Sequence, residues 1–477
     1  MNHLNPGTSR SFIEIVEVVG GQRIRNFWER SGAPALSTET PLLDARLRQG
    51  LVSDLPAIMQ APFQPRETIA DFQLDRAVEL VRLAAEIPIY AEKYYRAGIQ
   101  PAAVKSWEDF RRLPLITKPE LQAVYPDGCV HPSMQRDICF QTRSSGSSGM
   151  SLRIMVDLEA IAIDTLQGAR QFSLQSGRYK SSDTVANIYT VPWWTSAIGG
   201  RYVNHFISSL ISPQATADIL AELQPNIISL YPSNLDALLT HHTRWRHDDL
   251  QLVVTHSEQS SREQRRKWQS IIGVPVLDEY SSEEGTRIAL ECPCGHYHTC
   301  DDTVIFEILD PETMQTQQPG KPGIVVITNL LNRAMPFIRY VQGDIATAGP
   351  TSHCPIQWGC IENIQGRAND AFVTREGRVV PAGSILDATY RMMYDNDINL
   401  RRFELVQTDY EVVRLIAPSD MERGELEAAR RRLTELLTAS MEHPVRVDVV
   451  FNENGAGAPG LKHRPIKRQF DPKTRST

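Results

Sequence analysis

The sequence has no apolar run that approaches the ~18 residues of a membrane-spanning helix. Its first residues, MNHLNPGTSRSF, lack the apolar core of a secretory signal peptide. Basic residues are not in excess: 50 Lys and Arg stand against 57 Asp and Glu, for a net charge of −7. No general attraction to nucleic acid or to an anionic membrane is therefore expected. These absences predict a cytoplasmic enzyme or binding protein that binds neither nucleic acid nor a membrane.

The cysteines, seven in all, are not the even set that a disulfide framework needs. Five of them lie between residues 292 and 360, in a region that also holds His296 and His298. This clustering favours a metal site over chance. Buried free thiols are the alternative interpretation.

The pattern of apolar residues predicts the fold class. A length of 477 residues predicts two or three domains. From residue 138 onward, short β-rich runs alternate with helical segments, which predicts layered α/β structure with a largely parallel sheet. Strand-like runs separated by Gly, Pro and Asn turns begin near residue 303 and predict an antiparallel β subdomain. We therefore predict an α/β protein with an N-terminal extension over 1–70, a large domain over 71–366 and a small α+β C-terminal domain over 367–477.

A polar run, FQTRSSGSSGMSL, occupies residues 140–152. Successive Ser and Gly residues let backbone N–H groups converge on an oxyanion. The standard phosphate-binding P-loop also needs a Gly-Lys pair, and this run has Met150 where the lysine would stand. A P-loop kinase or NTPase is therefore disfavoured. Taken alone, the run favours a solvated hairpin loop over a phosphate site.

Two further stretches carry polar groups that suit a nucleotide. Tyr280, Glu283 and Glu284 follow an apolar run at a predicted strand end, where open α/β sheets bind ligands. An aromatic ring beside carboxylates suits adenine next to ATP-bound Mg²⁺. Asp344 follows Gly343 after an alternating strand, and a carboxylate there can accept both ribose hydroxyls. A solvated surface turn is the alternative in each case.

The order SSGSSG, YSSEEG, PFIRYVQGD and GRAND resembles the adenylate-forming superfamily of acyl-CoA synthetases, luciferases and adenylation domains. Five longer segments resemble its phenylacetate–CoA ligase branch: LPLITKPEL, QPNIISLYPSNLDALL, SEQSSREQRRKWQ, IALECPCGHYHTC and GIVVITNLLNRAMPFIRYVQGDIA. The likeness runs from about residue 70 to the end and is weakest in the last hundred residues. It implies that the small C-terminal domain is mobile and closes as a lid.

The resemblance also implies a reaction. A carboxylic acid is activated with ATP and Mg²⁺ as an acyl-adenylate, and the acyl group then passes to a thiol, most often that of coenzyme A. Mg²⁺ would be held by Glu283 or Glu284, because the family pattern YG.[ST]E stands here as YSSEE. Asp344 would bind the ribose, with Arg367 beside it. The implied phosphate loop comprises Ser144, Ser145, Gly146, Ser147, Ser148 and Gly149. The remaining nucleotide-site and hinge positions are Tyr280, Glu258, Asn369 and Asp370.

A mobile lysine of the small domain supplies a cation for adenylation in this family, and domain rotation later removes it. Lys462, in GLKHRP, is our first candidate and Lys467 our second. Met150 leaves the loop without its usual positive charge. Whether Arg143 or Arg153, at the two ends of the loop, replaces that charge is open.

Several relatives carry zinc where this chain has IALECPCGHYHTC, with ligands completed by a later C-x-C pair. Cys292 and His298 match the family's spacing, but SHCPIQWGC keeps only Cys354 of that pair. Cys294 offers a substitute ligand. The predicted structural zinc set is Cys292, Cys294, His298 and Cys354, with Cys300 and Cys360 in reserve.

The acid is expected to bind near YTVPWWTSAIGG, because relatives place acyl-binding aromatic residues there. Trp193 and Trp194 would stack on an aromatic or heteroaromatic acid, and Tyr231 would line the same pocket. Packing in the core or at a homodimer interface is the alternative for the tryptophans, and a core position is the alternative for Tyr231.

Coenzyme A is the expected acceptor, with an acyl-carrier protein or an amine as alternatives. A degenerate nucleotide-binding homologue without chemistry is a further alternative, suggested by Met150, by Ser281 in place of glycine and by the broken cysteine pair. The filled acidic, ribose and arginine positions count against that alternative.

Overall fold

The computed structural model describes residues 41–144, 151–190, 197–350, 354–396, 398, 400, 403–418, 421–452 and 462–470. Eleven of the described strands form one sheet, in the order β10-β11-β12-β13-β9-β8-β7-β6-β5-β3-β4. Its parallel part comprises β3 (Thr184–Tyr189), β4 (Val203–Ser208), β5 (Ile227–Leu230), β6 (Leu252–His256) and β7 (Val276–Ser282). Its antiparallel part comprises β8 (Thr286–Glu291), β9 (Tyr297–Thr299), β10 (Val304–Leu309), β11 (Pro322–Asn329), β12 (Tyr340–Ala348) and β13 (Cys360–Arg367). The predicted α/β class is confirmed, and the predicted antiparallel subdomain continues the parallel sheet.

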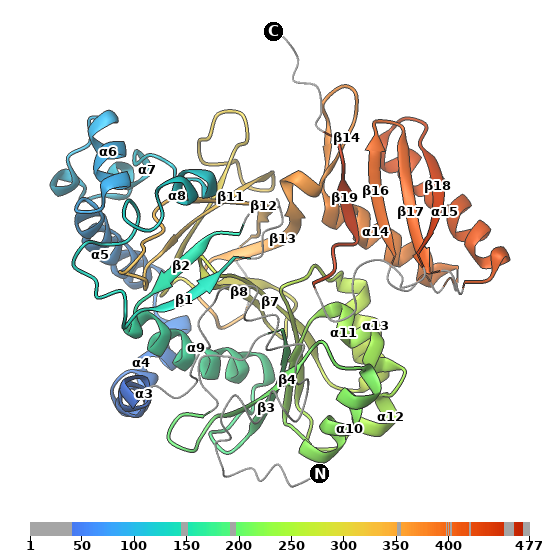
Figure 1. Ribbon diagram of the computed structural model, residues 1–477, viewed down its shortest axis with the longest axis horizontal. Helices are drawn as coiled ribbons and strands as arrows, with labels where there is room; N and C mark the ends of the chain where they lie inside the picture. Colours follow the sequence, from blue (N-terminus) through green and yellow to red (C-terminus); the bar gives the residue numbers. More distant parts are fainter. Residues whose placement is uncertain are drawn as a thin grey trace.

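Helices cover both faces of the parallel part, which explains why β5 and β6 are buried along their whole length. One face packs against α10 (Pro213–Leu223), α11 (Pro232–Leu239), α12 (His242–Trp245) and α13 (Arg262–Ile272). The other face carries α9 (Leu158–Ser176). Helix α9 begins where the Asp157 side chain accepts a hydrogen bond from the Ala160 N–H, and it ends at Gly177, which has a φ of 69°. Because α9 crosses the sheet, its inward side forms one wall of the cavity described below (Figure 1).

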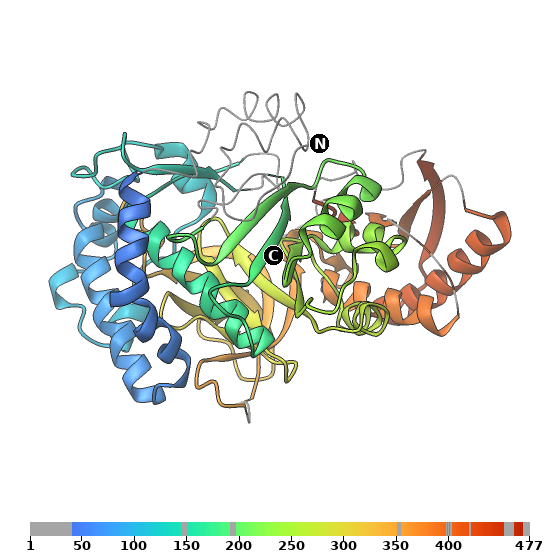
Figure 2. The same cartoon turned by 90° about the horizontal axis from the view of Figure 1, so that it is seen from below.

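The N-terminal helices lie at the end of the molecule opposite the small domain (Figures 1 and 2). They are α3 (Pro41–Ser53), α4 (Leu55–Gln60), α5 (Arg66–Ala84), α6 (Pro88–Arg96), α7 (Trp107–Arg111) and α8 (Lys118–Val124). Leu43, Leu47, Ile58 and Ile69 are buried in the same core as the antiparallel strands. The core of the large domain thus reaches back at least to residue 43, beyond the predicted boundary at 71. Among the described helices, none has the length and apolarity needed to cross a bilayer.

The small domain has its own hydrophobic core, separate from those of the large domain. After the short helix η3 (Ala368–Asp370), it contains β14 (Phe372–Val373), β15 (Val379–Val380), α14 (Ala382–Asp395), β16 (Glu404–Asp409), β17 (Val412–Pro418), α15 (Arg423–Met441), β18 (Arg446–Asn452) and β19 (Ile466–Arg468). Four of these strands form a sheet in the order β18-β17-β16-β19. A separate core is what a unit that moves as a rigid body requires.

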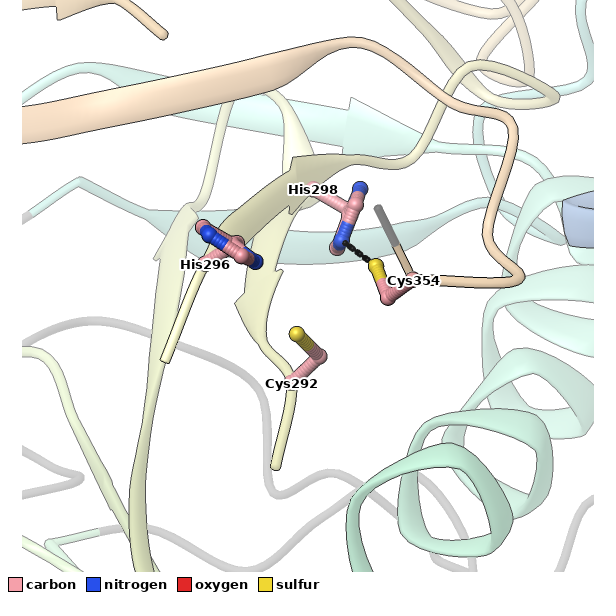
Figure 3. A group of neighbouring side chains, drawn as sticks. All are labelled: Cys292, His296, His298 and Cys354. Carbon is pink, nitrogen blue, oxygen red and sulfur yellow. Dashed lines mark hydrogen bonds between the residues drawn. The ribbon is translucent and has the colours of Figure 1, made fainter. Parts of the chain in front are cut away.

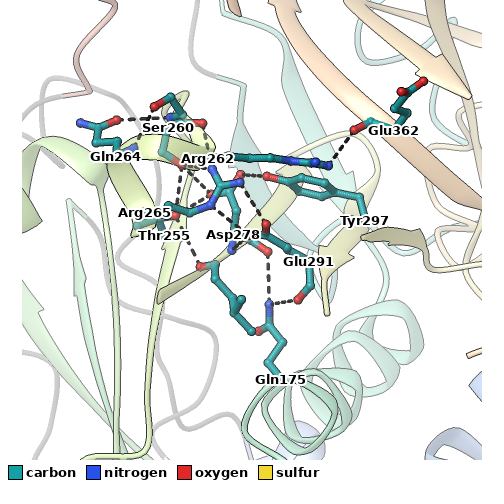
Figure 4. Close-up of polar contacts among 12 residues, drawn as sticks. Gln175, Thr255, Ser260, Arg262, Gln264, Arg265, Asp278, Glu291, Tyr297 and Glu362 are labelled. Atoms are coloured by element: carbon teal, nitrogen blue, oxygen red, sulfur yellow. Dashed lines mark hydrogen bonds and ion pairs between the residues drawn. The ribbon is translucent and has the colours of Figure 1, made fainter. Parts of the chain in front are cut away.

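A buried ionic network fixes the place where the large sheet changes from parallel to antiparallel (Figure 4). The Arg265 Nε of α13 lies 2.9 Å from the Glu291 carboxylate of β8, which also accepts the Asp278 N–H of β7 at 3.0 Å. The Tyr297 hydroxyl of β9 donates to the Asp278 carboxylate at 2.6 Å. Buried charges are stable only when they are paired in this way. The network holds β7 in place, and β7 ends in the YSSEE stretch.

Candidate active site

A cavity of about 220 Å³ lies at the carboxyl ends of the parallel strands, between the sheet, α9 and the small domain. Of the predicted site residues, the described ones that line it are Ser144, Glu283, Glu284, Arg367 and Lys462. Most of the predicted phosphate loop, Ser145 to Gly149, lies outside the described residues, as do Met150, Trp193 and Trp194. Ser144 closes the hairpin of β1 (Phe140–Arg143) and β2 (Arg153–Val156). Its backbone N–H donates to the Leu152 carbonyl, and its hydroxyl accepts the Leu152 N–H, each at 3.0 Å.

The Asp344 carboxylate is contacted by both Tyr280 and Arg367. The Tyr280 hydroxyl donates to one oxygen of Asp344 at 2.5 Å, and the Arg367 Nε lies 3.0 Å from the other. Asp344 and Arg367 stand directly opposite each other on β12 and β13, so the sheet itself fixes this pair. Gly343 precedes Asp344 with a φ of 81°, a conformation that favours glycine. Each carboxylate oxygen can accept more than one hydrogen bond, so Asp344 can also receive two neighbouring hydroxyls.

Glu283 and Glu284 both line the cavity but have different neighbours. Glu283 accepts the Thr142 hydroxyl at 2.7 Å. Burial raises its pKa, whereas Thr142 and the nearby Lys462 lower it, and the net direction is upward. Glu284 accepts the Tyr340 hydroxyl at 3.0 Å. Two carboxylates in one cavity offer the oxygen ligands that Mg²⁺ prefers.

Lys118, at the start of α8, also lines this cavity, and the sequence gave no chemical reason to single it out. Burial lowers its pKa, while the neighbouring Glu284 raises it and Arg367 lowers it further. Neither Arg143 nor Arg153 is among the lining residues. Lys118 is therefore the described cation best placed to compensate for Met150.

Lys462 and His463 of the small domain contact the large domain, and the next residue, Arg464, pairs at the hinge. Lys462 places its Nζ 5.9 Å from the Tyr189 ring centroid. Burial would lower its pKa, but Tyr189, Glu283 and Glu258 outweigh that effect, so the pKa is raised and the lysine stays protonated. The His463 N–H donates to Glu258 at 2.6 Å, and Arg464 pairs with Asp370 at the predicted hinge.

Lys467, the second candidate, lies elsewhere. Its Nζ is 2.7 Å from Glu404 of the small domain, and it does not line the cavity. The geometry therefore favours Lys462.

Glu258 and Tyr231, predicted as nucleotide-binding and acyl-binding residues, do not line the cavity. Ser257, with a φ of 66°, turns the chain after β6, and Glu258 accepts the Ser233 N–H and hydroxyl at the N-terminus of α11, both at 2.9 Å. Tyr231 is completely buried, with its ring centroid 5.6 Å from that of His256. It packs behind the cavity wall, as the alternative interpretation of a core tyrosine predicted.

A second group of side chains lies on the hairpin of β8 and β9 and just before β13 (Figure 3). The ligand atoms of Cys292, His296, His298 and Cys354 all lie within 4.8 Å of one another. The predicted zinc set is corrected at one position, because His296 takes the place of Cys294, which is exposed. Gly295, with a φ of 79°, turns the chain so that His296 and His298 fall two residues apart on one side of the strand. The reserve residues Cys300 and Cys360 are not in the group.

The composition of this group suits zinc. Two thiols and two imidazoles are a common tetrahedral set, and zinc holds such ligand atoms roughly 3.3–3.8 Å apart. The His298 Nε2 already lies 2.9 Å from the Cys354 sulfur. Burial lowers the pKa of His298 to about 4, which keeps the imidazole in its neutral, ligating form.

Comparisons with known proteins support the assignment of the fold and of the enzyme class. The phenylacetate-coenzyme A ligase of Pseudomonas putida is 25% identical over 346 residues, which cover 68% of this chain and 77% of the relative. The enzyme of the same name from Escherichia coli K12 is 24% identical over 62% of this chain and 70% of its own length. No protein-family model matches the chain.

Among solved structures, a 2-hydroxyisobutyryl-CoA ligase in its postadenylation state superposes with a TM-score of 0.72 at 19% identity, covering 86% of this chain and 91% of the other. The same enzyme in its thioesterification state gives a TM-score of 0.59.

The chain shares its fold with the 2-hydroxyisobutyryl-CoA ligase, and its sequence is similar to those of the phenylacetate-coenzyme A ligases. These similarities confirm the resemblance to the adenylate-forming superfamily and to its phenylacetate–CoA ligase-like branch. The expectation of an AMP-forming acid–thiol ligase is confirmed at the level of enzyme class, because the named relatives are CoA ligases.

Proposed function

We propose that this protein adenylates an aromatic or heteroaromatic acid with ATP and transfers the acyl group to coenzyme A. One observation carries the proposal: Arg367, which shares the Asp344 carboxylate with Tyr280, and the protonated Lys462 of the other domain line the same cavity. A degenerate homologue would have no need to keep a buried lysine at that point. No disulfide bond joins cysteines in the part of the chain that the structure describes, which supports a reducing compartment such as the cytoplasm.

The chemistry follows from these positions. The substrate carboxylate attacks the α-phosphorus of ATP, a P–O bond forms, and the bond to pyrophosphate breaks. Negative charge gathers on the phosphoryl oxygens, and Lys462 and Lys118 are the cations placed to stabilise it. Asp344 holds the ribose hydroxyls, which fixes the α-phosphate relative to both lysines. Glu283 and Glu284 would hold Mg²⁺, whose bound form neutralises charge on the leaving pyrophosphate.

The aromatic character of the acid is supported by the wall remote from the trio. Phe172, Tyr179 and Tyr202 line the cavity there. The rings of Phe172 and Tyr179 are T-shaped at 5.5 Å, and those of Tyr179 and Tyr202 lie 5.8 Å apart. A planar acid can pack against such a cluster.

We also propose that Cys292, His296, His298 and Cys354 bind a structural zinc ion. The group lies on β8, β9 and the approach to β13, apart from the reaction cavity. Zinc would join the β8–β9 hairpin to the segment before β13, and it has no role in the proposed reaction.

The proposal is tested by measuring pyrophosphate release across aromatic, heteroaromatic and aliphatic acids, with and without coenzyme A. Acid-dependent release followed by formation of an acyl-CoA thioester is the expected result. Release that requires a carrier protein or an amine would show that this molecule, and not coenzyme A, is the acyl acceptor. No release with any acid would favour the degenerate homologue.

A further inference from the structure

The part of the cavity remote from the nucleotide trio is markedly polar for a site that would hold an aromatic acid. One wall is the face of the parallel sheet and the other is the inward side of α9. The polar groups that line this part are Asp164, Thr165, Asn187, Asn204, Ser229, His256, Glu279 and Arg287. A site for a plain hydrocarbon acid has no use for them, because each must lose water when the acid binds.

Arg287 does not offer its charge to a ligand. It lies 2.6 Å from the Asp164 carboxylate, donates to the Asp164 carbonyl at 2.8 Å, and donates to the Gln171 side-chain oxygen at 2.8 Å. Gly168 of α9 makes room for this arrangement, because a Cβ there would stand 3.0 Å from an Arg287 nitrogen. Asp164 and Arg287 therefore neutralise each other within the wall.

Glu279 is the second carboxylate that lines this part of the cavity. It accepts the Gln171 amide at 2.7 Å, and among the described residues it forms no ion pair with a lysine or arginine. His256 stands beside it on the neighbouring strand, but burial lowers the pKa of His256 to about 4, so this imidazole is neutral. Two carboxylates thus face one guanidinium in this part of the cavity, and the charge of Arg287 acts on both of them. The next cation is Lys462 of the small domain, whose charge reaches His256.

The same face holds a further acceptor. The side-chain oxygen of Asn204 is buried and accepts no hydrogen bond from the described residues. Asn187 and Ser229 stand side by side on β3 and β5, between the Asn204 end and the Glu279 end of this face. Acceptors thus follow the cavity from β7 to β4, and a ligand with hydrogen-bond donors would satisfy them.

We propose that the acid bears a nitrogen donor, an amino group or a ring N–H, which binds Glu279. The inference rests on the proposed function and specifies its substrate class. Hydrogen bonds to a charged group discriminate strongly, since an analogue without the donor leaves the half-buried Glu279 carboxylate with the Gln171 hydrogen bond alone. A second carboxylate on the acid would be repelled, so aromatic dicarboxylic acids are excluded as substrates.

The test compares matched acids by ATP–pyrophosphate exchange. The pairs are 2-aminobenzoate with 2-methylbenzoate, 4-aminobenzoate with 4-methylbenzoate, and pyrrole-2-carboxylate with thiophene-2-carboxylate. We expect kcat/KM to favour the nitrogen-bearing member of at least one pair by about tenfold or more. Glu279→Gln should remove that preference, because kcat/KM for the nitrogen-bearing member should fall about tenfold more than kcat/KM for the donor-free member. The matched control is Glu435→Gln, an exposed carboxylate on α15, which should change neither.

The outcomes separate the two proposals. Exchange that is equal for both members of every pair would overturn the nitrogen-donor inference and leave adenylation intact. An equal loss for both members in Glu279→Gln would show that Glu279 is only structural, and would also overturn it. No exchange with any acid would overturn the proposed function, and the inference with it.

Discussion

At the scale of single residues, the proposed nucleotide site depends on Asp344. Its two oxygens are held from two other strands, one by Tyr280 of β7 and one by Arg367 of the adjacent strand β13. The carboxylate is therefore oriented before a nucleotide arrives, and no side chain has to reorganise to receive the ribose. Removing the carboxylate would also leave the Tyr280 hydroxyl and the Arg367 guanidinium without their shared partner.

Asp344→Ala should abolish adenylation, with a loss of about a hundredfold or more, because two charge-assisted hydrogen bonds to the ribose disappear. The measurement is ATP–pyrophosphate exchange over a range of ATP concentrations. Tyr280→Phe keeps the carboxylate and the ring, so its loss should be about tenfold. An unchanged KM for ATP in Asp344→Ala would contradict the assignment of the ribose site.

At the scale of elements, the sequence motifs predicted which residues lie in strands and turns. They predicted less well which residues of different elements contact one another. Glu283 lies just beyond a strand end, as predicted, because turn residues are local signals. Asp344 was expected to follow its strand and instead lies within β12. Lys118 and Glu279 were missed, because their place in the cavity depends on how α8 and β7 pack, which no local pattern records. The exchange of Cys294 for His296 has the same cause: the path of a tight turn decides which side chains face inward.

Metal analysis of the purified protein should find about one zinc ion per chain. His296→Ala and Cys292→Ser should each lose it and lower the melting temperature, since the ion joins β8 and β9 to the segment before β13. Cys294→Ser is the matched control and should keep both the zinc and the melting temperature. Retention of zinc in His296→Ala together with its loss in Cys294→Ser would restore the quartet predicted from the sequence.

At the scale of the whole molecule, the reaction cavity is complete only when the two domains meet. The large domain supplies Arg367 and both glutamates to the cavity lining, whereas Lys462 comes from the small domain. The change in strand pattern predicted a domain boundary near Arg367, but no local pattern predicted the contact between the domains.

Lys462→Ala should lower adenylation by about a hundredfold and spare thioester formation from a preformed acyl-adenylate, because its cation serves only the first half-reaction. Pyrophosphate release and acyl-CoA formation, measured separately, give the two rates. Lys467→Ala is the control: its ion pair with Glu404 lies within the small domain, so adenylation should persist. Full adenylation by Lys462→Ala would show that another residue supplies the cation.

Glu258 accepts hydrogen bonds from both domains, and this determines what happens when they separate. One of its oxygens accepts both the Ser233 hydroxyl and the His463 N–H, and the other accepts the Ser233 N–H. If the small domain swings away, Ser233 still satisfies both oxygens, so no buried charge is stranded by the departure. The contact between the two domains can therefore break and form again without leaving the Glu258 carboxylate unpaired. The rate of turnover can then depend on how often this contact breaks.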